Sequence, residues 1–283
     1  MPQQRSFVDA HGVTVQYYVW EAQSPRAVLQ LAHGLGEYAM RHAGLAEALA
    51  SSGISVYADD HRGHGQTGLG QNPLKLGALG PGGLRAAVED LHQLTTIISA
   101  ETKGIPIYFL GHSWGSLMGQ RLINEYASDF AGAIFTGTAY RMPGSMNGGD
   151  LNAKHKHLGT TGYEWLSRDE AVSAAFVADP LTFYADALKL FGVADGLRLF
   201  GRPRKPMPAD IPVLLVTGSE DSLGGEASVN RLAESYVERG GLTDVEVVVY
   251  ADARHEVFQE TNKDEVIADV QAWLEKRLAQ RVR

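Results

Sequence analysis

Ser113 is the residue of this chain best placed to act as a nucleophile, because it lies in a G-x-S-x-G motif over residues 111–115. An apolar run over residues 105–110 leads into the motif, and a helix-like pattern follows it. A strand, this turn and a helix together form a nucleophile elbow, which exposes the serine oxygen at the edge of a sheet. Glycine tolerates the unusual backbone angles that so sharp a reversal needs. We therefore predict that Ser113 is a catalytic nucleophile.

A serine hydroxyl becomes reactive when a nearby base takes its proton and a third group orients that base. His255 is the candidate base, and Asp221 and Glu220 are the candidate acids, because all three closely follow short apolar runs. Loops at the carboxyl ends of parallel strands share one edge of a sheet, so we expect these residues to meet Ser113 there. The order serine, acid, histidine is typical of this arrangement. The residues alone leave the choice of acid open, and Glu256, next to His255, is interpreted as a solvated loop residue.

The oxyanion of a tetrahedral intermediate needs hydrogen-bond donors, which backbone amides commonly supply. The residue after the candidate nucleophile is Trp114, and its amide is the expected first donor. The second donor is expected from the loop over residues 33–36, which follows an apolar run over residues 27–32. We choose the amide of Leu35 for this role.

Three other histidines are interpreted as structural. His33 is expected to hold the loop that carries Leu35. His61 and His64 resemble a pair of metal ligands, but no third ligand is evident around them in the sequence. We therefore predict no metal site.

Short apolar runs alternate with helix-like stripes, which predicts an α/β fold with a mainly parallel sheet covered by helices on both faces. An alternating pattern over residues 13–19, preceded by a turn at residues 11–12, predicts a hairpin. The other predicted strands cover residues 27–32, 54–58, 105–110, 132–136, 213–217 and 245–250. Helical stripes cover residues 84–98, 117–126, 229–236 and 266–278.

This rhythm is interrupted between two of the predicted strands, in a segment rich in large apolar residues such as Phe176 and Phe183. The segment holds a Gly-rich loop and two helix-like pieces, at residues 143–149, 164–177 and 181–200. So many apolar residues are unusual for a solvated excursion. We predict an α/β core over residues 1–137 and 209–283 and an inserted, mainly helical cap, or lid, over residues 138–208.

Composition narrows the classes of partner. The net charge of −8 argues against nucleic acid as a partner, since binding to the phosphate backbone needs clustered Lys and Arg. The absence of cysteine excludes a disulfide framework and a thiolate nucleophile. The amino terminus lacks the apolar core of a signal peptide, and no apolar run is long enough to span a bilayer. A cytoplasmic location is expected, and a peripheral membrane contact through the cap is left open.

Five segments of the chain resemble one family, the monoacylglycerol lipase and lysophospholipase branch of the α/β-hydrolases. They are spread over almost the whole chain, at residues 33–42, 60–67, 111–115, 218–221 and 255–260. The first and the last are fairly specific to this branch, which includes serine aminopeptidases of the S33 type. The G-x-S-x-G motif marks the whole superfamily.

The resemblance implies that the catalytic triad is Ser113, Asp221 and His255, and it favours Asp221 over Glu220. It implies oxyanion donors at Leu35 and Trp114, no cofactor, and hydrolysis of a small hydrophobic ester of the acylglycerol or lysophospholipid class. The cap, residues 138–208, is then expected to bind the acyl chain. The chain departs from the family pattern after the serine, where Trp114 is bulky and Ser116 replaces a glycine.

Two other functions share this scaffold. A serine aminopeptidase would need acidic cap residues to hold the substrate amine, and Glu164, Asp169 and Glu170 are candidates that we interpret as helix surface. A protein that binds a hydrophobic ligand with little turnover would use the same pocket, although an intact Ser113, Asp221 and His255 argue against it. A dehalogenase or epoxide hydrolase is disfavoured, because those enzymes resemble this chain but carry an aspartate at the position of Ser113.

Overall fold

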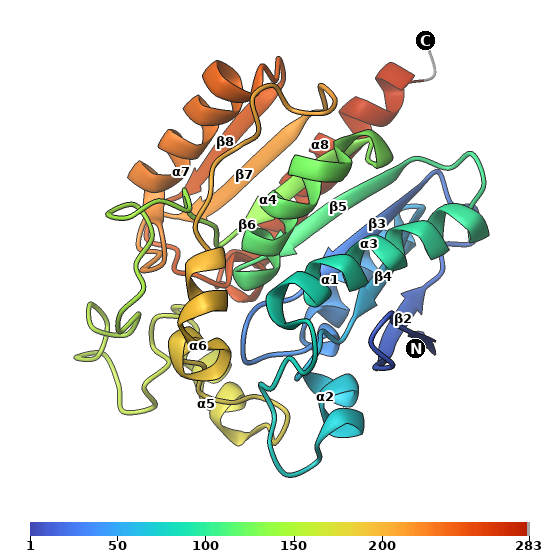
Figure 1. Cartoon of the computed structure of the whole chain (residues 1–283). Coiled ribbons are helices and arrows are strands. Elements are labelled where there is room, and N and C mark those ends of the chain that lie inside the picture. Colours follow the sequence, from blue (N-terminus) through green and yellow to red (C-terminus); the bar gives the residue numbers. More distant parts are fainter. Residues whose placement is uncertain (282–283) are drawn as a thin grey trace.

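The computed structural model describes residues 1–281 and contains one eight-stranded sheet (Figure 1). The strands lie in the order β1-β2-β4-β3-β5-β6-β7-β8. β2 is antiparallel to β1 and to β4, and all other neighbours are parallel. The strands are β1 (Gln3–Val8), β2 (Thr14–Trp20), β3 (Ala27–Ala32), β4 (Ile54–Asp59), β5 (Ile107–His112), β6 (Gly132–Thr136), β7 (Val213–Gly218) and β8 (Val245–Tyr250). The predicted α/β class and mainly parallel sheet are confirmed.

Helices cover both faces of the sheet and produce two hydrophobic cores. α3 (Gly83–Glu101), α4 (Trp114–Tyr126) and α7 (Gly225–Glu234) contribute buried residues to one core, and α1 (Ala43–Ser51) and α8 (Lys263–Arg281) to the other. All residues of β3 to β7 are buried, which explains why these strands are near-continuous apolar runs in the sequence. Among residues 1–281, no helix is both long enough and apolar enough to cross a bilayer.

Several short elements were not predicted. They are α1, α2 (Gly65–Gln71), the 3-10 helices η1 (Ala39–His42), η2 (Ala127–Asp129) and η4 (Val257–Gln259), and the π-helical turn η3 (Ser235–Gly240) that continues α7. α1 buries only Leu45, Ala46 and Leu49, a stripe too short to stand out in the sequence. α2 holds three glycines, which lower its intrinsic helix propensity.

The chain leaves the sheet after β6 and returns with β7, and the two helices between them lie at one end of the sheet (Figure 1). These helices, α5 (Glu170–Ala178) and α6 (Ala187–Arg198), are shorter than the predicted pieces. Asp169 and Asp186 explain where they begin, because each carboxylate caps the helix that follows it. Gly192, with φ 75°, breaks α6. The boundaries at residues 138 and 208 stay a prediction.

Arg62 links three parts of the core, although its side chain is almost fully buried at 1% exposure. Its Nε donates to Asp90 of α3 at 2.6 Å, and its Nη2 pairs with Asp9 in the turn between β1 and β2. Its Nη1 donates to two backbone carbonyls in the loop before α3. A buried cation with this many partners holds the hairpin and α3 against the loop that follows β4.

Replacing Arg62 by alanine should be strongly destabilising, because it leaves two buried carboxylates without their cation. We expect Arg62→Ala to lower the free energy of unfolding by about 3–5 kcal/mol. Arg26→Ala is the matched control, since its pair with Glu275 is half exposed, and we expect a loss below about 1 kcal/mol. Urea denaturation compares the two variants, and equal losses would contradict the role given to Arg62.

Candidate active site

Ser113 lies at a sharp turn between β5 and α4, with φ 52° and ψ −121°. The two glycines of the motif are required by close contacts. A Cβ on Gly111 would lie 2.6 Å from the carbonyl oxygen of Gly115, and a Cβ on Gly115 would lie 2.2 Å from that of Ala32. The amide of Ser113 donates to the carbonyl of Thr136 on β6 at 2.9 Å, which holds the turn against the sheet.

His255 and Asp221 lie together at one edge of the sheet. β5 ends at the same edge, directly before Ser113. The His255 Nδ1 lies 2.9 Å from the Asp221 Oδ1, and the imidazole is only 1% exposed. Asp221 is held in turn by the amide of Leu223, which donates to the same Oδ1 at 2.9 Å. Glu220 points elsewhere and pairs with Lys154 of the cap. The structure therefore brings Asp221 to His255 and not Glu220.

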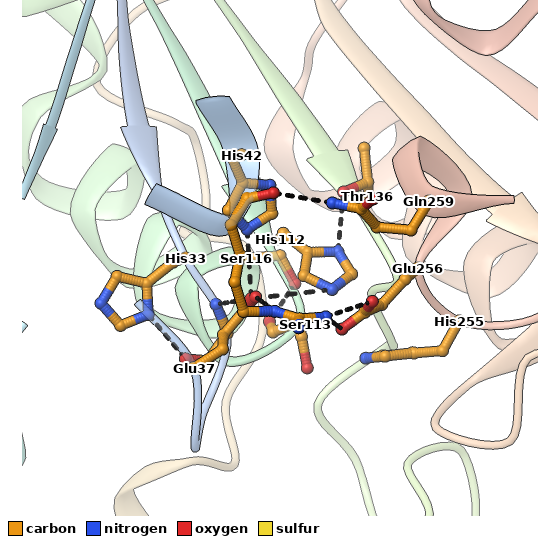
Figure 2. A network of polar contacts seen from close by, with 12 residues as sticks. His33, Glu37, His42, His112, Ser113, Ser116, Thr136, His255, Glu256 and Gln259 are labelled. Atoms are coloured by element: carbon orange, nitrogen blue, oxygen red, sulfur yellow. Dashed lines mark hydrogen bonds and ion pairs between the residues drawn. The ribbon is translucent and has the colours of Figure 1, made fainter. Parts of the chain in front are cut away.

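The contact with Asp221 assigns the protons of the His255 ring. Since an ionised carboxylate only accepts hydrogen bonds, Nδ1 carries a proton, and Nε2 is free to act as a base. Nε2 is buried, and within residues 1–281 it has no recorded hydrogen-bond partner. In Figure 2 the His255 ring points toward Ser113, and both residues line the same cavity. Burial opposes a charged imidazole, but the charge and the hydrogen bond of Asp221 outweigh it and raise the pKa of His255.

Among the described residues, the two amides expected to hold an oxyanion both lack an acceptor. Within the described residues, neither the Leu35 N–H nor the Trp114 N–H has a recorded partner. The loop that carries Leu35 lies directly against the elbow, since a Cβ on Gly34 would be 3.0 Å from the Cβ of Ser113. Unpaired amides beside a nucleophile fit the geometry that an oxyanion needs.

His33 fixes the peptide that carries the Leu35 amide. Its Nε2 accepts a hydrogen bond from the His61 amide at 3.0 Å, so its Nδ1 must carry the proton. Nδ1 then donates to the carbonyl of Gly34 at 2.7 Å. In a trans peptide the N–H points opposite to the C=O, so the Leu35 N–H points away from His33. Burial lowers the pKa of His33 well below its usual range and keeps the ring neutral.

A buried ionic network joins the loop of Leu35 to the loop of His255. Arg41 donates to Glu37 at 3.1 Å and to both oxygens of Glu256 at 2.9 and 2.7 Å. Glu37 also accepts a hydrogen bond from the Gly34 amide at 2.5 Å. Figure 2 shows Glu37 and Glu256 as parts of this network, with His255 next to Glu256.

The interpretation of Glu256 as a solvated loop residue was wrong. Its side chain is buried by the network, at 4% exposure, and is paired with Arg41. Burial raises the pKa of Glu256, although Arg41 opposes the shift. The sequence analysis included Glu37 and Arg41 only as part of the family motif at residues 33–42 and gave them no role. Their link to Glu256 was missed, because a pair more than 200 positions apart leaves no local pattern.

A cavity of about 400 Å³ opens beside Ser113 and His255. The cap supplies much of its wall, including Tyr163, Trp165, Phe176, Phe183, Leu188 and Phe200. The core supplies Leu35, Leu117 and Trp114, whose ring lies 5.3 Å from that of Phe191. Bulky Trp114 is thus part of the wall, while the Ser116 hydroxyl is used structurally and donates to the Ser113 carbonyl at 2.5 Å. The site can accommodate an apolar group next to the nucleophile.

Acidic residues of the cap are largely occupied by structural contacts. Glu164 was interpreted as helix surface, but it is buried and accepts hydrogen bonds from Thr161 and Asn152.

The next residue, Trp165, was not predicted to be part of the site, yet its ring centroid lies 4.6 Å from that of His255. Among the described residues, no group of three or more His, Asp or Glu side chains is arranged to hold a metal ion.

Comparison with known proteins shows the family to which the chain belongs. A family model described as serine aminopeptidase, S33, matches residues 23–262. The chain belongs to this family of α/β-hydrolases. A monoacylglycerol lipase of Mycolicibacterium smegmatis is 31% identical over 287 residues, which cover 97% of this chain and 98% of the relative. The monoglyceride lipase of Homo sapiens is 25% identical over 96% of this chain and 90% of its own length.

A solved structure of similar shape supports the fold. A thermostable carboxyl esterase from Bacillus coagulans matches 98% of this chain and 99% of its own, with a TM-score of 0.84 at 23% identity. The predicted place of the chain in the monoacylglycerol lipase-like branch of the S33 family is confirmed. The catalytic roles of individual residues stay predictions.

Mutation can distinguish which of the two candidate acids, Asp221 or Glu220, acts with His255 in this S33 family member. We expect Asp221→Asn to lower kcat by about 10⁴-fold, because His255 would lose the partner that fixes its tautomer. Glu220→Gln should change kcat less than about threefold, since the Glu220 side chain pairs with the exposed Lys154 and the site keeps the carboxylate of Asp221. Steady-state ester hydrolysis measures both. Similar losses in the two variants would contradict the assignment of Asp221.

The pH dependence of kcat/KM should report the raised pKa of His255. Only the neutral ring can accept the serine proton, so activity should fall as the pH drops through that pKa. Because Asp221 raises the pKa, the acid limb should lie above pH 6.5, the usual value for histidine. In Asp221→Asn the residual activity should show this limb at lower pH, and an unmoved limb would mean that another group titrates.

Proposed function

We propose that this serine ester hydrolase cleaves carboxylic esters with a hydrophobic acyl chain, of the monoacylglycerol class, through an acyl-enzyme on Ser113. The observation that carries the proposal is the meeting of Ser113, the His255 and Asp221 pair, and an apolar cavity at one edge of the sheet. The relatives named monoacylglycerol lipase and monoglyceride lipase support the same class of substrate. The proposal needs no metal and no cofactor.

In the proposed mechanism, the Ser113 oxygen attacks the ester carbonyl while its proton passes to the His255 Nε2. The amides of Leu35 and Trp114 donate to the oxyanion that forms, and Asp221 stabilises the imidazolium. The intermediate collapses, the bond to the alcohol breaks, and His255 returns the proton to the leaving oxygen. A water molecule then attacks the acyl-enzyme with the same base, releasing the fatty acid and restoring Ser113.

The apolar side chains that line the cavity support the proposal that an apolar acyl group is the main recognition element of the substrate. Each buried methylene contributes about 0.8 kcal/mol, so kcat/KM should rise about fourfold per carbon until the cavity is full. Trp114, which forms part of the wall on the core side, then limits the length that fits there. A cytoplasmic location and a peripheral membrane contact stay predictions.

A serine aminopeptidase is the second candidate, because the description of the matching family model names that activity. It would need a free carboxylate near Ser113 for the substrate amine. Glu164 is already bonded to Thr161 and Asn152, Asp169 caps α5, and the residues that line the cavity beside Ser113 include none of Glu164, Asp169 and Glu170. These contacts favour the esterase.

The test is a panel of p-nitrophenyl esters and 1-monoacylglycerols graded by chain length, together with an aminoacyl arylamide. We expect ester hydrolysis with one optimal chain length, no arylamide cleavage, and a loss of about 10⁶-fold in kcat for Ser113→Ala. Thermal unfolding of Ser113→Ala controls for folding. Arylamide cleavage without ester cleavage would favour the aminopeptidase, and activity that survives in Ser113→Ala would overturn the mechanism.

A further inference from the structure

The loop that carries Leu35 is bonded to the cap as well as to the core. Two hydrogen bonds cross from it to the segment over residues 179–185, which connects α5 to α6. The Phe183 amide donates to the Gly36 carbonyl at 3.0 Å, and the Tyr38 hydroxyl donates to the Asp179 Oδ2 at 2.7 Å. The cap is therefore in contact with the residue that follows the proposed oxyanion donor.

The two segments pack too closely at Gly36 for a side chain. Gly36 has φ 82°, and a Cβ there would lie 2.5 Å from the Phe183 carbonyl oxygen and 3.2 Å from the Ala185 Cβ. Within residues 1–281, the Phe183 amide is the one recorded hydrogen-bond partner of the backbone groups of Leu35 and Gly36. His33 and Glu37 hold Gly34 from the core side, so the second half of the loop depends on the cap.

The cap segment is braced internally and also lines the cavity. The Asp179 Oδ1 accepts from the Leu181 amide at 2.8 Å, and the Thr182 hydroxyl donates to the Asp179 carbonyl at 3.0 Å. Phe183 and Ala185 form part of the cavity wall next to Leu35. The same short segment thus faces the space proposed for the acyl chain and holds the loop proposed to bind the oxyanion.

We propose that Tyr38 and Asp179 are positioning residues that couple acyl-chain binding to the placement of the Leu35 amide. An acyl chain packed against Phe183 and Ala185 keeps the segment in place, and the two hydrogen bonds keep the loop of Leu35 in its donor geometry. Part of the binding energy of the chain then appears as stabilisation of the transition state, and so in kcat rather than in KM. This inference rests on the proposed ester hydrolysis.

Tyr38→Phe tests the coupling, since it removes one hydroxyl and keeps the ring. For the wild type we expect kcat to rise with the length of the acyl chain. In Tyr38→Phe we expect kcat on long-chain esters to fall roughly 10- to 100-fold, because a displaced oxyanion donor costs this much. KM should change less than about twofold, and the dependence of kcat on chain length should flatten, because binding to the cavity is preserved while its link to the loop is lost.

Tyr250→Phe is the matched control. Its hydroxyl donates to the Asp269 Oδ2 at 2.6 Å, which is the same chemistry between β8 and α8, outside the cavity. We expect it to keep the kcat of the wild type at every chain length. If Tyr250→Phe lowered kcat as much as Tyr38→Phe does, the inference would be overturned.

Hydrogen exchange provides a readout that does not depend on turnover. Amides of residues 34–38 and 181–185 should exchange faster in Tyr38→Phe than in the wild type or in Tyr250→Phe. Unchanged exchange, unchanged kcat or a change confined to KM would overturn the inference while leaving ester hydrolysis intact. A wild-type protein that hydrolyses no ester would instead overturn the proposed function, and the inference with it.

Discussion

The reversal of the chain at Ser113 is the constraint on which the rest of the site depends. A serine with φ 52° is uncommon, and holding such a backbone costs on the order of 1–3 kcal/mol. The surrounding structure sustains it through the bond from Ser113 to Thr136 and through contacts that leave no room for a Cβ on Gly111 or Gly115. Because the buried strands on both sides of β5 fix the turn, the hydroxyl has a defined place toward which the other loops converge.

The histidines around this turn differ in the direction in which their environments shift the pKa. Burial without a strong ion pair keeps His33 and His112 neutral, with pKa values well below the usual range. His255 is as deeply buried, but its contact with Asp221 raises its pKa instead. Environments that push the pKa values of similar groups apart are how a fold assigns one of them to proton transfer. The neutral rings are then free to hold backbone, as His33 does for Gly34.

The sequence predicted well what local patterns encode. The eight strands, the elbow and the loops of Asp221 and His255 follow from apolar runs and from residues placed just after them. It predicted poorly what distant pairs and irregular loops create. The burial of Glu256 depends on Arg41, and that of Glu164 depends on Asn152 and on a loop without regular structure. The lengths of α5 and α6 were set by two capping aspartates and a glycine inside an otherwise apolar pattern.

The cap contacts two loops of the candidate site, the loop of Leu35 and the loop of His255. Besides the Phe183 contact with the loop of Leu35, the carbonyl of Leu166 accepts from the Glu256 amide at 2.7 Å, and Trp165 covers the ring of His255. A change in the cap sequence therefore affects the loop of His255, the proposed base, and the loop of the proposed oxyanion donor, as well as the shape of the cavity. In the proposed mechanism, the same segments contact the cavity and both of these loops, so the choice of substrate and the rate of the chemical step are expected to change together.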